Sequence, residues 1–312
     1  MSLNYSRLLR DEDLVEHFLD KVLQFDHRTI PKIIQRIVIS EKMLLDFKEN
    51  ENTLISSKHR DRSYKDEINR WDLRKQVIDE LFTQTRLEEE DETSLTKGGL
   101  LPNSKMKNEK KVFIIIGPPA SGKSGIANKI SEDEGAIILD SDYAKRKLPE
   151  FEYPCGATLV QEESNRIVFG FKEDNPHKLK SVYQLSIENS FNMVIPKIGK
   201  EPEGIIDLAV YLTKIGYEVN LTLVSLKRRE ATIRAVSRFD KSKRYVPLGY
   251  IFDQIGNDPI LTYYLIKAKG KEFFSSFGAI STDVDIKDSP ICIDLEGNNP
   301  ASHYKQNLAQ FF

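Results

Sequence analysis

An α/β fold, in which a parallel sheet is wrapped by helices and preceded by a small all-helical N-terminal region, is predicted by three features of this 312-residue sequence. Residues 112–116 are an apolar run without alternation, as in a strand buried on both faces. After this run, short apolar segments alternate with amphipathic ones, which is the order of strands and crossover helices. Residues 11–86 contain no glycine and place apolar side chains at helical spacing.

The N-terminal region, residues 1–86, is predicted to form three amphipathic helices that make a small bundle or pack on the following domain. The first begins after Asp11 and the second near Pro31, because acids and proline favour the first turn of a helix. The third carries Trp71, which we interpret as a core or interface anchor. The apolar stripes are Leu14, Val15, Phe18, Val22 and Leu23, then Ile33, Ile34, Ile37, Val38, Met43, Leu44, Leu45 and Phe47, then Ile68, Val77, Ile78, Leu81 and Phe82.

A linker is predicted over residues 87–107, ahead of a domain that spans residues 108–312. Residues 88–92 are all acidic, and residues 98–111 hold two adjacent glycines, a proline and a basic cluster. Because such a composition buries little apolar surface, we expect a mobile, solvated tether. The alternative is a functional role in which the acidic run is attracted to a basic cleft.

The eight residues after the first apolar run match the phosphate-loop pattern G-x-x-x-x-G-K-[ST] without a mismatch. Its glycines let successive backbone N–H groups turn towards phosphate oxygens, and the next helix adds the positive end of its dipole. Lys123 is placed to reach the β- and γ-phosphates, and the Ser124 hydroxyl to bind Mg²⁺. The sequence therefore predicts a nucleotide site on a P-loop NTPase-type sheet. The residues expected to bind the nucleotide are Gly117, Pro118, Pro119, Ala120, Ser121, Gly122, Lys123, Ser124 and Gly125.

Three further strands are predicted after the phosphate loop, at residues 136–139, 192–195 and 219–224. Helices are predicted over residues 159–171, 180–190, 205–215, 228–238 and 262–277. In a parallel sheet of this kind the ligand lies beyond the carboxyl ends of the strands. The residues just after each strand are therefore the candidates for chemistry.

Two acids, Asp140 and Asp142, follow the second predicted strand. A carboxylate there can bind Mg²⁺ or accept the proton of a substrate hydroxyl. The alternative is a cap for a helix at residues 143–145, which Ser141 or Asp142 would also supply. We expect Asp140 to bind the metal and Asp142 to be the catalytic base.

The segment after the fourth predicted strand is basic, from Lys227 to Arg244. Arg238 and Arg244 bracket a short polar stretch that would form a lid over a triphosphate. Guanidinium groups stabilise the charge of a transferring phosphoryl group better than lysine does. An exposed basic helix end, or a patch for a nucleic-acid backbone, explains the same residues about as well.

In combination these motifs resemble the zeta toxin family of P-loop kinases. The shared patterns are Gly-x-Pro-x-Ser-Gly-Lys-Ser at 117–124, Leu-Asp-Ser-Asp-Tyr-Ala-Lys at 139–145, Leu-Pro-Glu-Phe at 148–151, Arg-Phe at 238–239 and Arg-Tyr-Val-Pro at 244–247. The resemblance covers roughly residues 108–260 and implies ATP- and Mg²⁺-dependent phosphorylation of a sugar hydroxyl on a nucleotide sugar, usually UDP-N-acetylglucosamine. It implies that Lys123 and Ser124 are the phosphate-loop pair and that Asp142 is the catalytic base. It also implies that Arg238 and Arg244 clamp the triphosphate.

One stretch departs from the family pattern. Many members have an acid in a Val-Ile-Glu-Gly-Thr type segment after the third strand, whereas residues 194–200 contain none. Lys197 and Lys200 of this stretch are candidate substrate residues. Glu162 and Glu163 are candidates for a substrate-facing carboxylate, with a solvated helix face as the alternative.

Family members are typically held in check by a small three-helix antitoxin. Residues 1–86 have a similar size, so one hypothesis makes them a tethered inhibitor, while scaffolding is the plainer interpretation. A separate antitoxin is the other partner that the resemblance implies. Two rival functions stay open: a kinase for another hydroxyl, on a dinucleotide or a nucleic-acid end, and a nucleotide-dependent switch with little turnover.

The composition of the whole chain limits the remaining classes. A net charge of −2 gives no overall attraction to nucleic acid or acidic membranes. Two cysteines, Cys155 and Cys292, are too few for a disulfide framework and lack metal-ligand spacing. No signal peptide is recognisable, and no apolar run is long enough to cross a bilayer. We therefore expect a cytoplasmic protein with neither a membrane nor a nucleic-acid partner.

Overall fold

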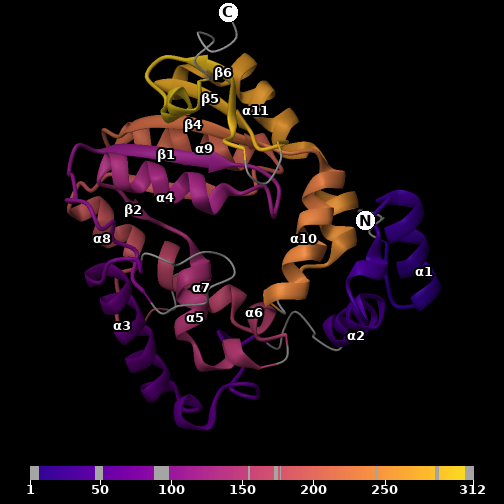
Figure 1. Cartoon of the computed structure of the whole chain (residues 1–312). Helices are drawn as coiled ribbons and strands as arrows, with labels where there is room; N and C mark the ends of the chain where they lie inside the picture. Colours follow the sequence, from indigo (N-terminus) through magenta and orange to yellow (C-terminus); the bar gives the residue numbers. More distant parts are fainter. Residues whose placement is uncertain are drawn as a thin grey trace, which may run out of the picture. The chain divides into compact units, whose positions relative to one another are not determined.

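The computed structural model describes residues 7–45, 52–87, 98–153, 155–171, 175, 177–242, 245–284 and 288–305. The chain forms two compact units, each assembled from segments that are distant in sequence (Figure 1). The first unit comprises Met1–Val38, Lys110–Ile130 and Val194–Phe312, and the second comprises Ile39–Glu109 and Ser131–Met193.

The six strands of the sheet follow the order β2-β3-β1-β4-β5-β6. They are β1 (Lys111–Ile116), β2 (Ile137–Ile138), β3 (Met193–Lys197), β4 (Glu218–Ser225), β5 (Ser276–Ser281) and β6 (Ile291–Glu296). In the first unit β1 pairs with β4 and β4 with β5, both in parallel, whereas β6 runs antiparallel to β5. Five of the six residues of β1 and six of the eight of β4 are buried, as expected for strands covered on both faces. The predicted α/β fold with a largely parallel sheet is confirmed.

The N-terminal helices of the first unit pack on its helix α10 (Figure 1). Residues such as Phe18, Leu19 and Ile37 share one hydrophobic core with Val236 and Phe252. The helices of this unit are α1 (Glu12–His17), η1 (Phe18–Val22), η2 (His27–Thr29), the start of α2 (Ile33–Leu45) and of α4 (Lys123–Glu134), α9 (Pro202–Lys214), α10 (Arg228–Ser242), η6 (Tyr250–Ile255), α11 (Asp258–Lys269), η7 (Lys271–Phe273) and η8 (Pro300–Tyr304).

The second unit is built around the long helix α3 (Glu67–Thr83), which begins at an Asp66 cap and packs against α5, α7 and α8. Its other helices are η4 (Arg62–Tyr64), α5 (Ser141–Lys147), η5 (Pro149–Glu152), α6 (Gly156–Leu159), α7 (Gln161–Phe169) and α8 (Val182–Glu188). Trp71 is half-buried beside Phe171 and Arg74, in keeping with a packing role. The predicted helical region thus contributes to both units, with residues 1–38 in one and 39–86 in the other.

The second half of the predicted linker is packed instead of solvated. Leu100 is fully buried, and its carbonyl oxygen accepts a hydrogen bond from the Ile138 N–H at 3.1 Å. Leu101 forms a β-bridge with Thr85. Apolar residues between the two glycines and the basic cluster therefore tie residues 98–107 to the second unit. The acidic run at residues 88–92 lies outside the described residues.

The C-terminal part of the sheet differs from the prediction of a helix over residues 262–277. Helix α11 ends at Lys269, and β5 begins at Ser276. Asn299 fastens this end of the sheet, since its side chain donates to the Leu221 carbonyl at 3.1 Å and accepts from the Thr222 hydroxyl at 3.0 Å. Among the described residues, none of the helices combines the length and the apolar character that a membrane crossing requires.

Candidate nucleotide-binding site

The loop between β1 and α4 has the strained, inward-turned backbone that its sequence predicts. A Cβ atom on Gly117 would lie 2.5 Å from the Val224 carbonyl oxygen, so only glycine allows this close approach. Ala120 and Gly122 both adopt the left-handed region, with φ of 61° and 85°. The Gly117 N–H donates to the Ile198 carbonyl at 3.1 Å, which anchors the start of the loop. The loop is therefore a preformed backbone turn of the kind that binds anions.

Lys123 lies at the first position of α4 and points back into the turn. Its Nζ donates to the carbonyl oxygens of Gly117 at 2.8 Å and Pro118 at 2.7 Å. Ser124 follows it and is half-buried. The Ser121 hydroxyl is buried and has no hydrogen-bond partner among the described residues. An ammonium group and an unsatisfied hydroxyl on such a turn suit a ligand rich in oxygen atoms.

The loop is braced by a residue that sequence reasoning missed. Thr282 follows β5, and its hydroxyl donates to the Ser121 carbonyl at 2.8 Å. The Thr282 carbonyl in turn accepts from the Arg234 guanidinium of α10 at 2.5 Å. Strand β5 was not predicted, because its first residues fall within the helix predicted over residues 262–277. With β5 recognised, the rule that ligands lie beyond the strand ends would have identified Thr282.

Replacing Thr282 by valine should weaken nucleotide binding about threefold to tenfold, because the loss of one buried hydrogen bond is worth about 1 kcal/mol. The shape of the side chain is preserved, so the backbone bond from the Thr282 N–H to the Ser225 carbonyl at 3.1 Å should persist. Titration calorimetry with ATP measures the effect. Ser302→Ala, which removes a hydroxyl from helix η8 and leaves Thr282 unchanged, is the control. An unchanged affinity in Thr282→Val would contradict the bracing role.

Of the two predicted clamp arginines, Arg238 is described and Arg244 is not. Arg238 is half-buried on α10, in the same unit as the loop. Arg244 lies outside the described residues. Elsewhere on the basic helix, Arg228 stacks over the Phe252 ring at 4.5 Å, and Arg229 pairs with Glu230 at 2.5 Å. Part of the basic character of α10 is therefore used in packing.

The two predicted catalytic acids belong to the second unit. Asp140 caps α5, and its carboxylate accepts from the Asp142 N–H at 2.9 Å. Burial raises the pKa of Asp140, and the neighbouring charge of Asp142 raises it further. Asp142 pairs with Lys145, Oδ1 to Nζ, at 2.7 Å. The cap expected as an alternative thus exists, but Asp140 supplies it, and the carboxylate of Asp142 is held by a cation.

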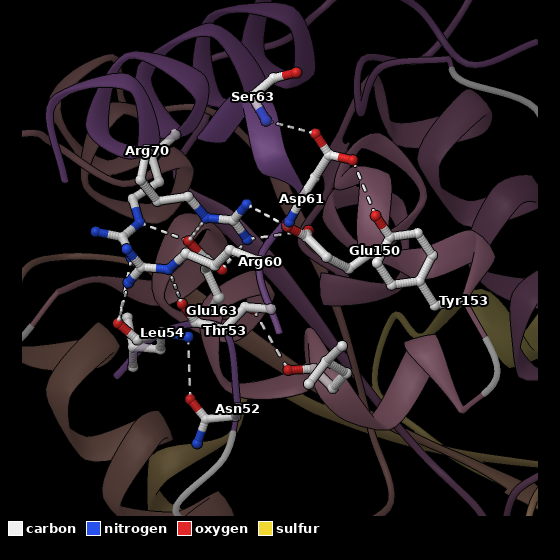
Figure 2. A network of polar contacts seen from close by, with 12 residues as sticks. Asn52, Thr53, Leu54, Arg60, Asp61, Ser63, Arg70, Glu150, Tyr153 and Glu163 are labelled. Carbon is white, nitrogen blue, oxygen red and sulfur yellow. Dashed lines mark hydrogen bonds and ion pairs between the residues drawn. The ribbon is translucent and has the colours of Figure 1, made fainter. Parts of the chain in front are cut away.

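The candidate substrate residues fall into different settings. Glu162 and Lys200 are exposed, and Lys197 is half-buried at the end of β3. Glu163 is fully buried and pairs with Arg70 and with Arg74, Oε1 to Nε at 2.7 Å. Figure 2 shows Arg70 between Glu150 and Glu163. Because these ion pairs enclose its carboxylate, Glu163 is not available to bind a substrate, and its assignment as a substrate residue is wrong.

Comparison with known proteins assigns the sequence to a family. The family model of the zeta toxins, described as "Zeta toxin", matches residues 100–257, about half of the chain. The chain belongs to the zeta toxin family. The match includes the phosphate loop, Asp142 and Arg238, while residues 7–38 and Thr282 lie outside it.

Solved structures similar to this zeta toxin family member share little sequence with it. One is from the PezAT chromosomal toxin-antitoxin system of Streptococcus pneumoniae, with 16% identity, a TM-score of 0.45, and coverage of 65% of this chain and 78% of that one. Another is the native AvrRxo1-ORF1:-ORF2 complex, with 15% identity, a TM-score of 0.45 and coverage of 77% and 74%. A search of curated proteins finds no match.

Proposed function

We propose that this zeta toxin family member is an ATP- and Mg²⁺-dependent kinase that transfers the γ-phosphate to a sugar hydroxyl of a nucleotide sugar, with UDP-N-acetylglucosamine as the first candidate. Membership of the family supports ATP-dependent phosphotransfer. The single observation that carries the proposal is the turned phosphate loop with the Lys123 ammonium held inside it.

The residues of the loop fit a nucleotide triphosphate. Its backbone turns at Ala120 and Gly122, and the buried Ser121 hydroxyl offers a donor. For the metal, we propose the Ser124 hydroxyl and the Asp140 carboxylate as ligands, because Mg²⁺ prefers oxygen atoms. The described residues contain no cluster of three or more His, Cys, Asp or Glu suited to a metal. When bound, Mg²⁺ neutralises phosphate charge.

The remaining steps belong to side chains of this protein. Asp142 accepts the proton of the substrate hydroxyl, and Lys145 orients its carboxylate. Lys123, Arg238 and Arg244 stabilise the negative charge that develops on the transferring group. Glu162, Lys197 and Lys200 are proposed to contact the acceptor. A separate antitoxin is proposed as the protein partner, and a cytoplasmic site of action is part of the same proposal.

A different acceptor is the second candidate. Residues 194–200 lack the acid found in many family members, so the sugar-binding part of the site differs from the usual pattern. A dinucleotide or a nucleic-acid 5′-hydroxyl would keep the same phosphate chemistry and change only this part. The basic residues on α10 are compatible with either acceptor.

The experiment is phosphate transfer from γ-labelled ATP to a panel of nucleotide sugars, dinucleotides and oligonucleotides. We expect label on UDP-N-acetylglucosamine with the wild-type protein. Asp142→Asn should lower turnover about 10³-fold while leaving ATP affinity within about threefold, because a positioned base contributes 10²- to 10⁴-fold. Asp79→Asn, an exposed acid on α3, is the matched control. Near-native turnover of Asp142→Asn would exclude Asp142 as the catalytic base. ATP binding without phosphate transfer to any compound would favour a nucleotide-dependent switch over a kinase.

A further inference from the structure

The N-terminal segment, residues 7–38, is part of the core of the unit that contains the phosphate loop. Its buried side chains are Leu9, Val15, Phe18, Leu19, Leu23, Ile33, Ile37 and Val38, and they pack with Leu226, Ala231, Ala235, Val236, Phe239, Leu248, Ile251 and Phe252. Most of the second group lies on or just after α10. A segment that shares this much apolar surface cannot leave without exposing it to water.

The core reaches the positions of the proposed phosphate clamp. In the sequence Arg238 is followed directly by Phe239, and Arg244 by Tyr245. The two aromatic rings contact each other edge to face, with centroids 5.0 Å apart. Phe239 is 5% exposed, and Tyr245 packs against the same core. The backbone next to Arg238 is therefore fixed by packing that the N-terminal segment helps to form.

Arg36 of α2 makes the most specific contact between the segment and α10. Its guanidinium donates to the Asp240 carboxylate at 2.7 Å and to the Phe239 carbonyl at 3.0 Å. It also lies 4.7 Å over the Phe239 ring. Carbonyl oxygens in the last turn of a helix lack intrahelical donors and carry its negative dipole end, so a cation there holds the turn in place.

A second ion pair joins the N-terminal segment to the same core. Arg7 donates to both carboxylate oxygens of Asp253, at 2.8 and 3.1 Å. Its guanidinium also stacks over the rings of Phe18 and Phe252. The segment is thus joined to the α10–η6 region by apolar burial and by the contacts of two arginines. These contacts favour the interpretation that residues 7–38 are a permanent part of the unit and not a detachable inhibitor.

We propose that residues 7–38 are a positioning element for the arginine helix α10, and that Arg36 is the positioning residue that holds Arg238 ready for the triphosphate. This inference rests on the proposed function, because it requires Arg238 to bind phosphate. It assigns a role to a part of the chain that the family match does not include.

The test is a double-mutant cycle on the full-length protein, with the dissociation constant of Mg²⁺-ATP as the readout. Arg238→Ala should weaken binding about tenfold and Arg36→Ala about fivefold, as expected for charge-assisted hydrogen bonds. In the Arg238→Ala background, Arg36→Ala should have little further effect, since it acts through Arg238. Arg36→Lys should recover part of the affinity, because it keeps the cation without the planar fork. Arg28→Ala, which removes an exposed arginine of the same segment that pairs with the nearby Asp26, is the control.

A measurement without nucleotide distinguishes a positioning role of Arg36 from a general role in folding. Amide hydrogen exchange should rise in residues 236–242 of Arg36→Ala while β1 and β4 stay protected. If Arg36→Ala lowers stability too far, Asp240→Asn, which removes the negative charge from one Arg36 contact and keeps the carbonyl contacts, should give a smaller change of the same sign. Wild-type ATP affinity and wild-type hydrogen exchange in Arg36→Ala would contradict the positioning role of Arg36 and leave the proposed function intact. Wild-type affinity in Arg238→Ala overturns the clamp in the proposed function, and full additivity in the double variant assigns Arg36 a general structural role instead.

Discussion

Replacing Lys123 by alanine should lower phosphate transfer about 10²- to 10³-fold, because removing one preorganised donor from developing negative charge costs about 3–4 kcal/mol. Lys123 is already directed into the turn, where its Nζ lies 2.8 Å from the Gly117 carbonyl oxygen and 2.7 Å from that of Pro118. A triphosphate offers this ammonium stronger, charged acceptors than two carbonyl groups. Turnover with γ-labelled ATP and the ATP dissociation constant, measured together, give the effect.

The matched control is Lys129→Ala, an exposed lysine further along the same helix α4. It removes one positive charge from α4 without touching the loop, so it should change turnover by less than about twofold. Thermal unfolding of both variants shows whether the lost carbonyl contacts of Lys123 loosen the unit. Turnover of Lys123→Ala within a few-fold of the wild type would show that this loop does not act on phosphate.

The nucleotide loop could be predicted from the sequence because its physics is local. A buried apolar strand, two glycines at required backbone positions and a lysine at a helix start all lie within residues 112–124. The same holds for the helix cap after β2 and for the helix that begins at Arg228. The family assignment followed from these motifs and is confirmed by the family model.

Other features depend on contacts between distant residues and could not be predicted in this way. Residues 1–86 are divided between two units because their apolar faces pack against different helices. The spacing of apolar residues shows that a helix has a buried face, but it does not show which element covers that face. Strand β5 was missed because residues 262–277 keep apolar side chains at helical spacing across the break at Gly270. Glu163 was expected either to face the substrate or to lie on a solvated helix face, since a charged residue rarely becomes fully buried without a partner. Its partner, Arg70, is 93 residues away.

This pairing gives the prediction with the largest effect on stability. Arg70 and Glu163 are both fully buried, and Arg70 also pairs with the buried Glu150 at 2.7 Å (Figure 2). Glu163→Gln leaves two buried arginines short of negative charge, and breaking a buried pair in this way costs about 3–5 kcal/mol. Glu188→Gln is the control, because Glu188 is 49% exposed and its partner Lys180 is 55% exposed, and such surface pairs contribute about 1 kcal/mol or less. Urea unfolding of the full chain measures both variants.

The pH dependence of unfolding provides an independent test of the same contact. Burial raises the pKa of Glu163, but the hydrogen bonds and charge of Arg70, and then the charge of Arg74, outweigh this and lower the pKa from its ordinary value of 4.5 to about 2. A carboxyl whose pKa is lowered by folding stabilises the protein above its unfolded value and loses that contribution as the pH falls. The wild type should therefore lose stability between pH 4.5 and 2, and Glu163→Gln should lose less over this range. Equal slopes for the two proteins, or a Glu163→Gln stability within 1 kcal/mol of the wild type, would mean that Glu163 is not held as a charged partner of Arg70, and its carboxylate would again be a candidate for binding substrate.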